Sequence, residues 1–174
     1  YETGLSLGRL RPEQICKITK SNKLIGLNKP TKELFLHKAF YEKNKRRVGA
    51  VVHLHSIYSV AYSMMPGLDE NNVFDPLTPY SIMLLGKVKL LPFYLPGDPK
   101  LGKEIKGIAS KSSAVLLANH GPVVAGKNLE NATNAIEELE NTAKLAMITR
   151  GLSPNLLLNK QVLNVVKKFD VDWD

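Results

Sequence analysis

Cysteine is scarce in this sequence, with Cys16 as the only one among 174 residues. A single thiol cannot form a disulfide within the chain, and proteins of reducing compartments typically lack disulfides. One cysteine also cannot build a closed structural zinc site of the kind made from several. The sequence therefore predicts a cytoplasmic protein that depends on a packed core rather than on cross-links.

Long hydrophobic runs are missing as well. No stretch approaches the ~20 apolar residues that a membrane-spanning helix needs, and no signal-peptide pattern opens the chain. Apolar residues make up 44% and charged residues 23%, as in ordinary globular proteins. We expect no membrane partner, and the length predicts a single domain over residues 1–174.

Acidic residues are fewer than basic ones. The chain has 24 lysines and arginines and 16 aspartates and glutamates, which gives a formal charge of +8. Such a charge suits nucleic acid, an anionic membrane surface or small anionic ligands. The basic residues form short clusters, such as 43–47, with few aromatics between them, and no zinc finger or RNP-type motif occurs. We expect anionic metabolites rather than nucleic acid as partners, with plain solubility as the alternative.

Hydrophobic periodicity alternates between helical and strand-like segments. The helices predicted from it span 32–44, 57–65, a short stretch near 80, 101–110, 129–150 and 160–168. The predicted strands span 48–55, 88–94, 114–118 and 123–125. Asn128 precedes the longest helix and is a good N-cap. In this order the elements predict a three-layer or mixed α/β domain.

Only four histidines occur, and three of them lie at the ends of predicted strands. His53 and His55 are two positions apart on one strand, so their side chains leave the same face. His120 ends another strand, just before Gly121 and Pro122, where the chain must turn. If the two strands are neighbours, the three imidazoles meet and can bind one metal ion at about 2.0–2.1 Å. Three neutral ligands leave a position open, as in catalytic metal sites.

The spacing alone leaves other interpretations open. A His-x-His pair is often structural or incidental, and His37 on the first helix is expected to pack or to support a ligand. Glu33, in the first turn of that helix, either interacts with the helix dipole or moves protons near a metal. Tyr80 either packs or supplies a phenol for the chemistry.

Three segments together resemble the class II aldolase and adducin family. They are the strand with His53-Leu54-His55, the segment Ala118-Asn119-His120-Gly121 with the long helix after it, and Pro30-Thr31-Lys32-Glu33. The last of these resembles a Ser-Ser-Glu segment of that family. The resemblance covers nearly the whole chain and implies a three-layer α/β/α fold with a central, mainly antiparallel sheet. It also implies a homotetramer with active sites at subunit boundaries.

Within this family, four further runs most resemble the 3-oxo-tetronate 4-phosphate decarboxylases. They are residues 77–80, 94–99, 116–126 and 137–144. The resemblance implies a metal-dependent carbon–carbon lyase that converts a 3-oxo-tetronate 4-phosphate to dihydroxyacetone phosphate and CO2 through a metal-stabilised enediolate. A sugar-phosphate aldolase of the fuculose 1-phosphate type and a non-catalytic adducin-like module are the alternatives.

The resemblance also implies roles for individual residues. His53, His55 and His120 match the family's ligands for one divalent metal per subunit, with Zn2+ expected and Mn2+ or Co2+ as alternatives. Glu33 matches the acid/base carboxylate, which also ligates the resting metal. Tyr80 is similar in context to a tyrosine that transfers protons in sugar-phosphate aldolases.

Four positions match the family's contacts to the substrate phosphate, and they are Thr3, Gly4, Thr31 and Lys32. Lys32 replaces the second serine of the family's motif, which could strengthen anion binding or change the acid that is accepted. The family's Gly-Asn-x-Ser phosphate loop does not occur in this sequence. We therefore expect the family's N-terminal segment to be absent and the phosphate site to be incomplete.

Overall fold

The computed structural model describes residues 6–26, 28–43, 48–109 and 111–173. The helices are α1 (Leu34–Lys43), α2 (Ile57–Ser63), α3 (Pro79–Leu85), α4 (Pro99–Ile108), α5 (Leu129–Ile148) and α6 (Asn159–Phe169), with short 3-10 helices at η1 (Leu7–Arg9) and η2 (Pro12–Gln14). The strands are β1 (Lys17–Ile18), β2 (Leu24–Ile25), β3 (Ala50–His53), β4 (Lys89–Leu91), β5 (Ala114–Leu117) and β6 (Gly121–Gly126).

The central sheet has the strand order β3-β6-β5-β4. Strand β6 pairs antiparallel with both β3 and β5, whereas β4 pairs parallel with β5. Strands β1 and β2 form a separate antiparallel pair. The sheet is therefore mainly antiparallel, which confirms the predicted type.

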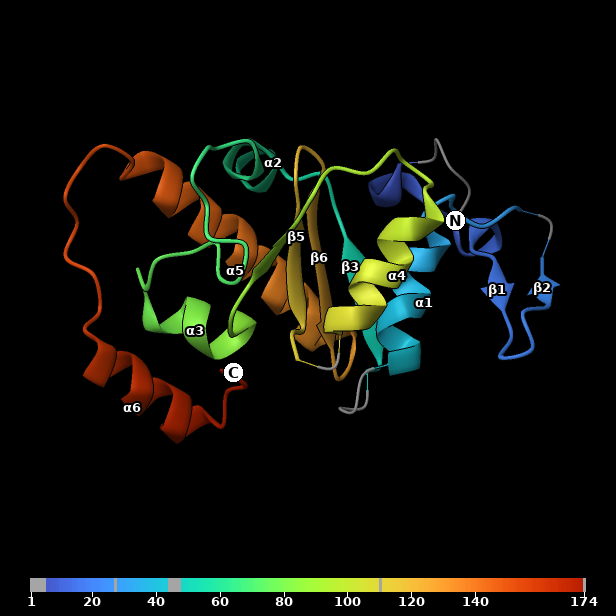
Figure 1. The fold of residues 1–174 in the computed structure, drawn as a ribbon. Helices are drawn as coiled ribbons and strands as arrows, with labels where there is room; N and C mark the ends of the chain where they lie inside the picture. Colours follow the sequence, from blue (N-terminus) through green and yellow to red (C-terminus); the bar gives the residue numbers. More distant parts are fainter. Residues whose placement is uncertain (1–5, 27, 44–47, 110, 174) are drawn as a thin grey trace.

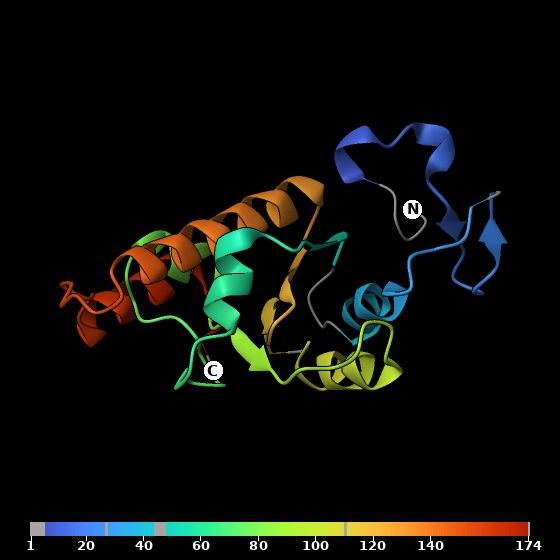
Figure 2. The same cartoon turned by 90° about the horizontal axis from the view of Figure 1, so that it is seen from above.

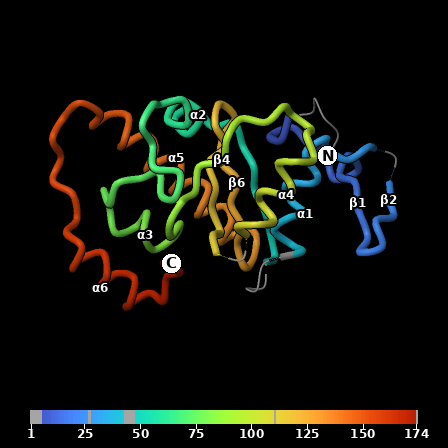
Figure 3. Tube along the Cα trace, viewed as in Figure 1, coloured from blue at the N-terminus to red at the C-terminus, as the bar shows by residue number. Residues whose placement is uncertain are grey.

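Helices cover both faces of this sheet, as the two perpendicular views show (Figures 1 and 2). Helices α1 and α4 pack against each other on one face, and α1 contacts β3. Helices α2 and α5 pack together on the other face, with α3 beside α5 and α6 against α3. The trace in Figure 3 shows the connection from α5 to α6 running along the outer side of the molecule. The predicted three-layer α/β/α fold is confirmed.

The core is divided in two by the alternation of side chains along the strands. Val115 and Leu117 pack with Leu36 of α1 on the α1 and α4 face, whereas Leu116 packs with Leu139 of α5 on the other face. All four residues of β5 are buried, because helices cover both sides of the strand. No helix in the described ranges has both the length and the apolar character that a bilayer crossing requires.

Two strands differ in length from the prediction at the point where they meet. Strand β3 ends at His53 instead of residue 55. The Leu54 N–H still donates to the Pro122 carbonyl at 3.4 Å. Pro122 has no N–H that could donate to Leu54 in exchange, so the ladder of backbone hydrogen bonds stops here. Strand β6 begins at Gly121 rather than at residue 123, because Gly121 and Pro122 already pair with β5. Strand pairing of this kind has no signal in the local sequence.

Candidate metal centre

The adjoining ends of β3 and β6 bring the three predicted histidines to one place. His53 is the last residue of β3 and pairs with Val123 of β6. His55 follows it by two positions in the connection to α2, and His120 lies in the turn between β5 and β6. Strands β3 and β6 are neighbours, which is the condition under which the sequence predicted that the three imidazoles meet.

Four side chains form a compact cluster. Glu33, His53, His55 and His120 each place one potential ligand atom within 4.8 Å of the others. His120 Nε2 lies 3.1 Å from His55 Nε2 and 3.0 Å from Glu33 Oε1. The second carboxylate oxygen, Glu33 Oε2, lies 3.3 Å from His53 Nε2. Ligands of a tetrahedral zinc ion are about 3.3 Å apart when its bonds are about 2.0–2.1 Å, so these spacings suit such an ion.

The backbone fixes the orientation of the His53 ring. His53 Nδ1 lies 2.9 Å from the Pro122 carbonyl oxygen. A carbonyl can only accept, so Nδ1 carries the hydrogen and Nε2 of the neutral ring presents its lone pair to the cluster. Among the described residues, this buried Nε2 has no hydrogen bond of good geometry. An imidazole held in this way is prepared for a metal ligand role, so the residues present fit a divalent cation.

Electrostatics keep two of these groups in the form that binds cations. The neighbouring His120 and His53 hold the pKa of Glu33 well below its usual range, although burial acts in the opposite direction. Burial lowers the pKa of His55, and the neighbouring His53 and His120 lower it further. An ionised carboxylate and a neutral imidazole are the protonation states that ligate metals.

Gly121 allows the two chain segments to approach each other beside the cluster. Its φ is +141°, and a Cβ at this position would lie 2.5 Å from the backbone oxygen of Leu54. Asn119, in the same turn, has φ of +57°, a left-handed conformation that asparagine tolerates better than most residues. Asn119 and Gly121 therefore suit the backbone conformation of this turn, and His120 between them supplies an imidazole to the cluster.

Glu33 enters the cluster from the segment just before α1. The Thr31 hydroxyl accepts a hydrogen bond from the Glu33 N–H at 3.3 Å, and the helix begins at Leu34 instead of residue 32. Thr31 is half-buried and Lys32 is exposed beside Glu33. The other two predicted phosphate contacts, Thr3 and Gly4, lie outside the described residues.

Tyr80 does not join the cluster within this chain. It is 61% exposed on α3, which packs against α5 and α6 and lies away from the meeting point of β3 and β6 (Figures 1 and 2). His37 is half-buried on α1, and burial lowers its pKa. It is not one of the four clustered residues, which agrees with its expected packing or supporting role.

An open hollow lies directly beside the imidazoles. His55, Asn119 and His120 line one side of it, and apolar residues of α2 together with Met64, just after that helix, line the other. Two of these, Ile57 and Met64, are 78% and 51% exposed. The hollow gives a small molecule direct access to the cluster.

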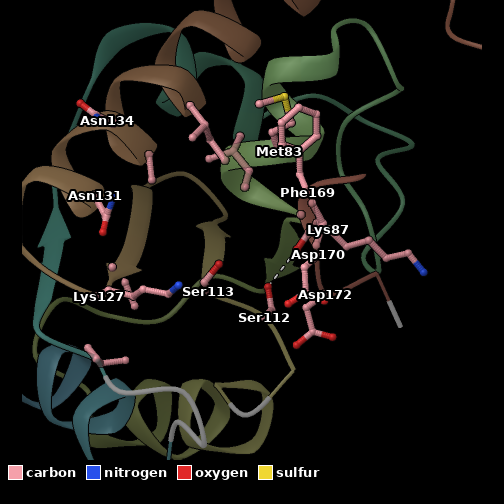
Figure 4. A pocket seen from close by; sticks show the side chains of 18 of the residues that line it. Met83, Lys87, Ser112, Ser113, Lys127, Asn131, Asn134, Phe169, Asp170 and Asp172 are labelled. Atoms are coloured by element: carbon pink, nitrogen blue, oxygen red, sulfur yellow. Dashed lines mark hydrogen bonds between the residues drawn. The ribbon is translucent and has the colours of Figure 1, made fainter. Parts of the chain in front are cut away.

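A second cavity, of about 290 Å³, lies at the opposite end of the sheet. Figure 4 shows polar side chains around it, including Lys127, Ser113 and Asn131. None of the four clustered residues lines this cavity. The chemistry expected of the histidines therefore belongs to the hollow beside α2.

Three groups that make hydrogen bonds to or beside the cluster were not assigned a role from the sequence. They are the Pro122 carbonyl, Ser63 and Glu140. A carbonyl leaves no signature in the residue pattern, and a buried serine in a helix resembles many others. Glu140 belongs to the run 137–144 that carries part of the family resemblance, which was the one available signal.

Comparisons with known proteins agree with the resemblance. Residues 1–147 match the family model described as Class II Aldolase and Adducin N-terminal domain. A 3-oxo-tetronate 4-phosphate decarboxylase from Escherichia coli O6:H1 is 48% identical over 146 residues, which make up 84% of this chain and 68% of that protein. An L-fuculose phosphate aldolase from Methanococcus maripaludis is 37% identical over 150 residues, or 86% of this chain and 78% of that protein.

A solved structure supports the same grouping. The crystal structure of YgbL from Escherichia coli aligns with a TM-score of 0.90 at 41% sequence identity. The alignment covers 94% of this chain and 79% of that one. The arrangement of layers is thus similar to that of this solved structure.

Proposed function

We propose that this chain, which belongs to the class II aldolase and adducin family, is a decarboxylase. Its substrate would be a 3-oxo-tetronate 4-phosphate, and its products would be dihydroxyacetone phosphate and CO2. Its relatives include named decarboxylases, so the chain is a lyase. The observation that carries the proposal is the meeting of three imidazoles and one carboxylate within 4.8 Å. Enzymes of this family use a divalent metal, and this cluster could bind one.

His53, His55 and His120 would hold the cation, with Glu33 within reach as a fourth ligand. A set of imidazoles and one carboxylate without cysteine suits zinc, while Mn2+ and Co2+ are chemical alternatives. When bound, a divalent ion held by neutral imidazoles supplies positive charge close to the substrate oxygens on which negative charge develops.

The reaction requires one proton at a defined carbon. The bond between the carboxylate and the hydroxyl-bearing carbon breaks, its electron pair stays on that carbon, and CO2 leaves. We assign the delivery of the proton to Glu33. Because His120 and His53 hold Glu33 ionised in the free site, the carboxylate must first take up a proton from solvent when the substrate enters, and this is the proton that the reaction consumes.

The remote end of the substrate needs contacts that orient it. Thr31 and Lys32 stand next to Glu33 in the chain, and we assign them to the substrate phosphate. An ammonium group there would attract the phosphate and hold the reacting end near the cluster. Thr3 and Gly4 are retained as predicted contacts of the same phosphate.

A second copy of the chain would complete the site. The apolar side of the hollow, with Ile57 and Met64 exposed, suits contact with a neighbouring subunit in a homotetramer. Tyr80 would then have to come from that neighbour, since it lies away from the cluster of its own chain. A cytoplasmic location, with no nucleic-acid or membrane partner, completes the proposal.

The alternative activity is that of a sugar-phosphate aldolase. It is favoured by the L-fuculose phosphate aldolase that is 37% identical. Cleavage of a phosphorylated sugar also leaves an electron pair on a hydroxyl-bearing carbon, so the same residues could serve both reactions. The two activities differ in the fragment that leaves, which is CO2 in one and an aldehyde in the other.

The experiment follows from that difference. Purified protein with added Zn2+ is incubated with a 3-oxo-tetronate 4-phosphate and, separately, with fuculose 1-phosphate. We expect CO2 from the first substrate and no aldehyde from the second. Aldehyde release alone would favour the aldolase, and a protein that binds no metal and releases neither product would be an adducin-like module.

A further inference from the structure

Helix α2 begins two residues after His55 of the cluster, and its first turn is capped from a distant helix. The backbone N–H groups of Tyr58 and Ser59 donate to Glu140 Oε1 and Oε2, both at 2.9 Å. The Ser59 hydroxyl, fully buried, donates to Oε2 at 2.6 Å. Ser56 occupies the N-cap position but makes no capping bond with its side chain. The carboxylate of α5 therefore caps α2 in its place.

The other end of α2 is tied to the turn that carries His120. Ser63, the last residue of the helix, is 4% exposed. Its hydroxyl donates to the Val60 carbonyl at 2.7 Å and accepts the Asn119 N–H at 3.0 Å. Asn119 immediately precedes His120, so this bond fixes the backbone next to the imidazole.

One short helix thus contacts the chain segments that supply two of the clustered histidines, His55 and His120. His55 lies two residues before the helix begins, and His120 lies one residue after the Asn119 amide that the helix holds. The Nε2 atoms of these two histidines are 3.1 Å apart. Their separation depends on where α2 lies, and the hydrogen bonds made by Glu140 and Ser63 hold its two ends.

We propose that Glu140 and Ser63 are positioning residues of the metal centre, which hold His55 and His120 at ligand spacing through the two ends of helix α2. The proposal rests on the proposed metal site. Neither residue touches the cluster itself, and both act through hydrogen bonds to backbone groups. Loss of groups that orient metal ligands costs about 10- to 100-fold in metal affinity.

The test is a Co2+ titration followed by visible absorption, because the absorption bands of cobalt report coordination geometry as well as binding. The variants are Glu140→Gln and Ser63→Ala, studied under conditions where circular dichroism shows each metal-free protein to be folded. We expect each variant to bind Co2+ about 10- to 100-fold more weakly and to give altered absorption bands. Lower thermal stability is expected of any structural residue, so the affinity of the folded protein is the deciding quantity.

Matched controls exist for both changes. Glu137→Gln removes an exposed carboxylate from the same helix α5. Ser81→Ala removes a buried hydroxyl that, like Ser63, donates to a carbonyl three residues earlier, here Thr78 at 2.9 Å. We expect both controls to bind Co2+ as the unaltered protein does. If one test variant does not fold, the other still tests the opposite end of the same helix.

The outcomes of the titration separate this inference from the proposed metal site. Test variants that bind as tightly as the controls, with unchanged absorption bands, would overturn the positioning role alone. Failure of the unaltered protein to bind Co2+ would instead remove the metal site, and the proposed function with it.

Discussion

At the scale of single residues, the Pro122 carbonyl decides what His53 can do. By accepting the hydrogen of Nδ1 at 2.9 Å, it leaves the lone pair of Nε2 facing Glu33 and the other imidazoles. Glu33 in turn places one oxygen near His53 and the other near His120. Each side chain is thus held by a partner that suits a ligand role.

Glu33→Gln separates metal binding from proton transfer. Three imidazoles remain in the variant, so we expect it to retain its metal, as measured by elemental analysis. Its turnover should fall by about 10²- to 10⁴-fold, because the amide cannot carry the proton. Full activity in this variant would remove Glu33 from the mechanism.

Gly121→Ala tests the close approach of the two segments beside the cluster. A Cβ would lie 2.5 Å from the Leu54 oxygen at a φ of +141°, so we expect a loss of about 1–3 kcal/mol in the free energy of unfolding, measured with urea. Gly107→Ala is the control, since a Cβ in that helix meets nothing within 4 Å. The control should be neutral or stabilising by up to about 1 kcal/mol. Equal effects of the two changes would contradict the strain argument.

The sequence predicted the meeting of the histidines but not the groups that orient them. The spacing of His53 and His55, together with His120 before a Gly-Pro turn, predicted convergence on the condition that their strands were neighbours, and the family resemblance strengthened that prediction. The Pro122 carbonyl could not be foreseen, because any backbone oxygen could have taken that place. For Tyr80 the sequence context was misleading about position. The context is similar to that of a catalytic tyrosine of the family, but within a single chain Tyr80 lies away from the cluster.

At the scale of elements, helix α2 depends on a carboxylate that is 81 residues away in sequence. Burial alone would raise the pKa of Glu140, but the hydrogen bonds from Ser59 and from the Tyr58 and Ser59 amides outweigh it and lower the pKa. The ionised form is thus the one that the folded protein stabilises.

The stabilisation from Glu140 should therefore depend on pH in a defined direction. A carboxyl whose pKa is lowered on folding stabilises the protein above its ordinary value of 4.5, and this contribution is lost as the pH falls through the folded-state pKa. We expect Glu140→Gln to reduce the free energy of unfolding by about 1–3 kcal/mol at pH 7. The difference from the unaltered protein should narrow in urea titrations below pH 4.5. A difference that stays constant across this range would contradict the assignment.

Helices were easier to predict than strands, for a physical reason. Helix α5 was predicted from residue 129 to 150 and spans Leu129–Ile148, because its capping by Asn128 and its apolar periodicity are local. Strand β3 was predicted to reach residue 55 and stops at His53. Its end depends on a proline in a partner strand that is 69 residues away.

At the scale of the whole molecule, the cluster joins parts of the chain that would otherwise be linked only through the core. Glu33 precedes α1 on one face of the sheet, whereas His55 leads into α2 on the other. A cation held between them would therefore connect both helical layers. Because the unfolded chain has no such site, binding should stabilise the folded state.

Removal of metal should consequently lower the melting temperature. At a free metal concentration of about 1,000 times the dissociation constant, binding contributes about 4 kcal/mol. For a chain of this size, each kcal/mol corresponds to about 2–4 °C in the melting temperature. We expect a chelator to lower the melting temperature by roughly 10 °C in scanning calorimetry and added Zn2+ to restore it. The His53→Ala variant is the control and should respond to neither addition.

The most direct test of the account is the metal content of the purified protein. The protein is exposed to Zn2+, unbound Zn2+ is removed, and the metal that remains is measured by inductively coupled plasma mass spectrometry. The account predicts about one zinc ion per chain for the unaltered protein, as for other single three-ligand sites, and almost none for His53→Ala or His120→Ala. An unaltered protein that retains no divalent metal, or histidine variants that retain as much as it does, would contradict the account.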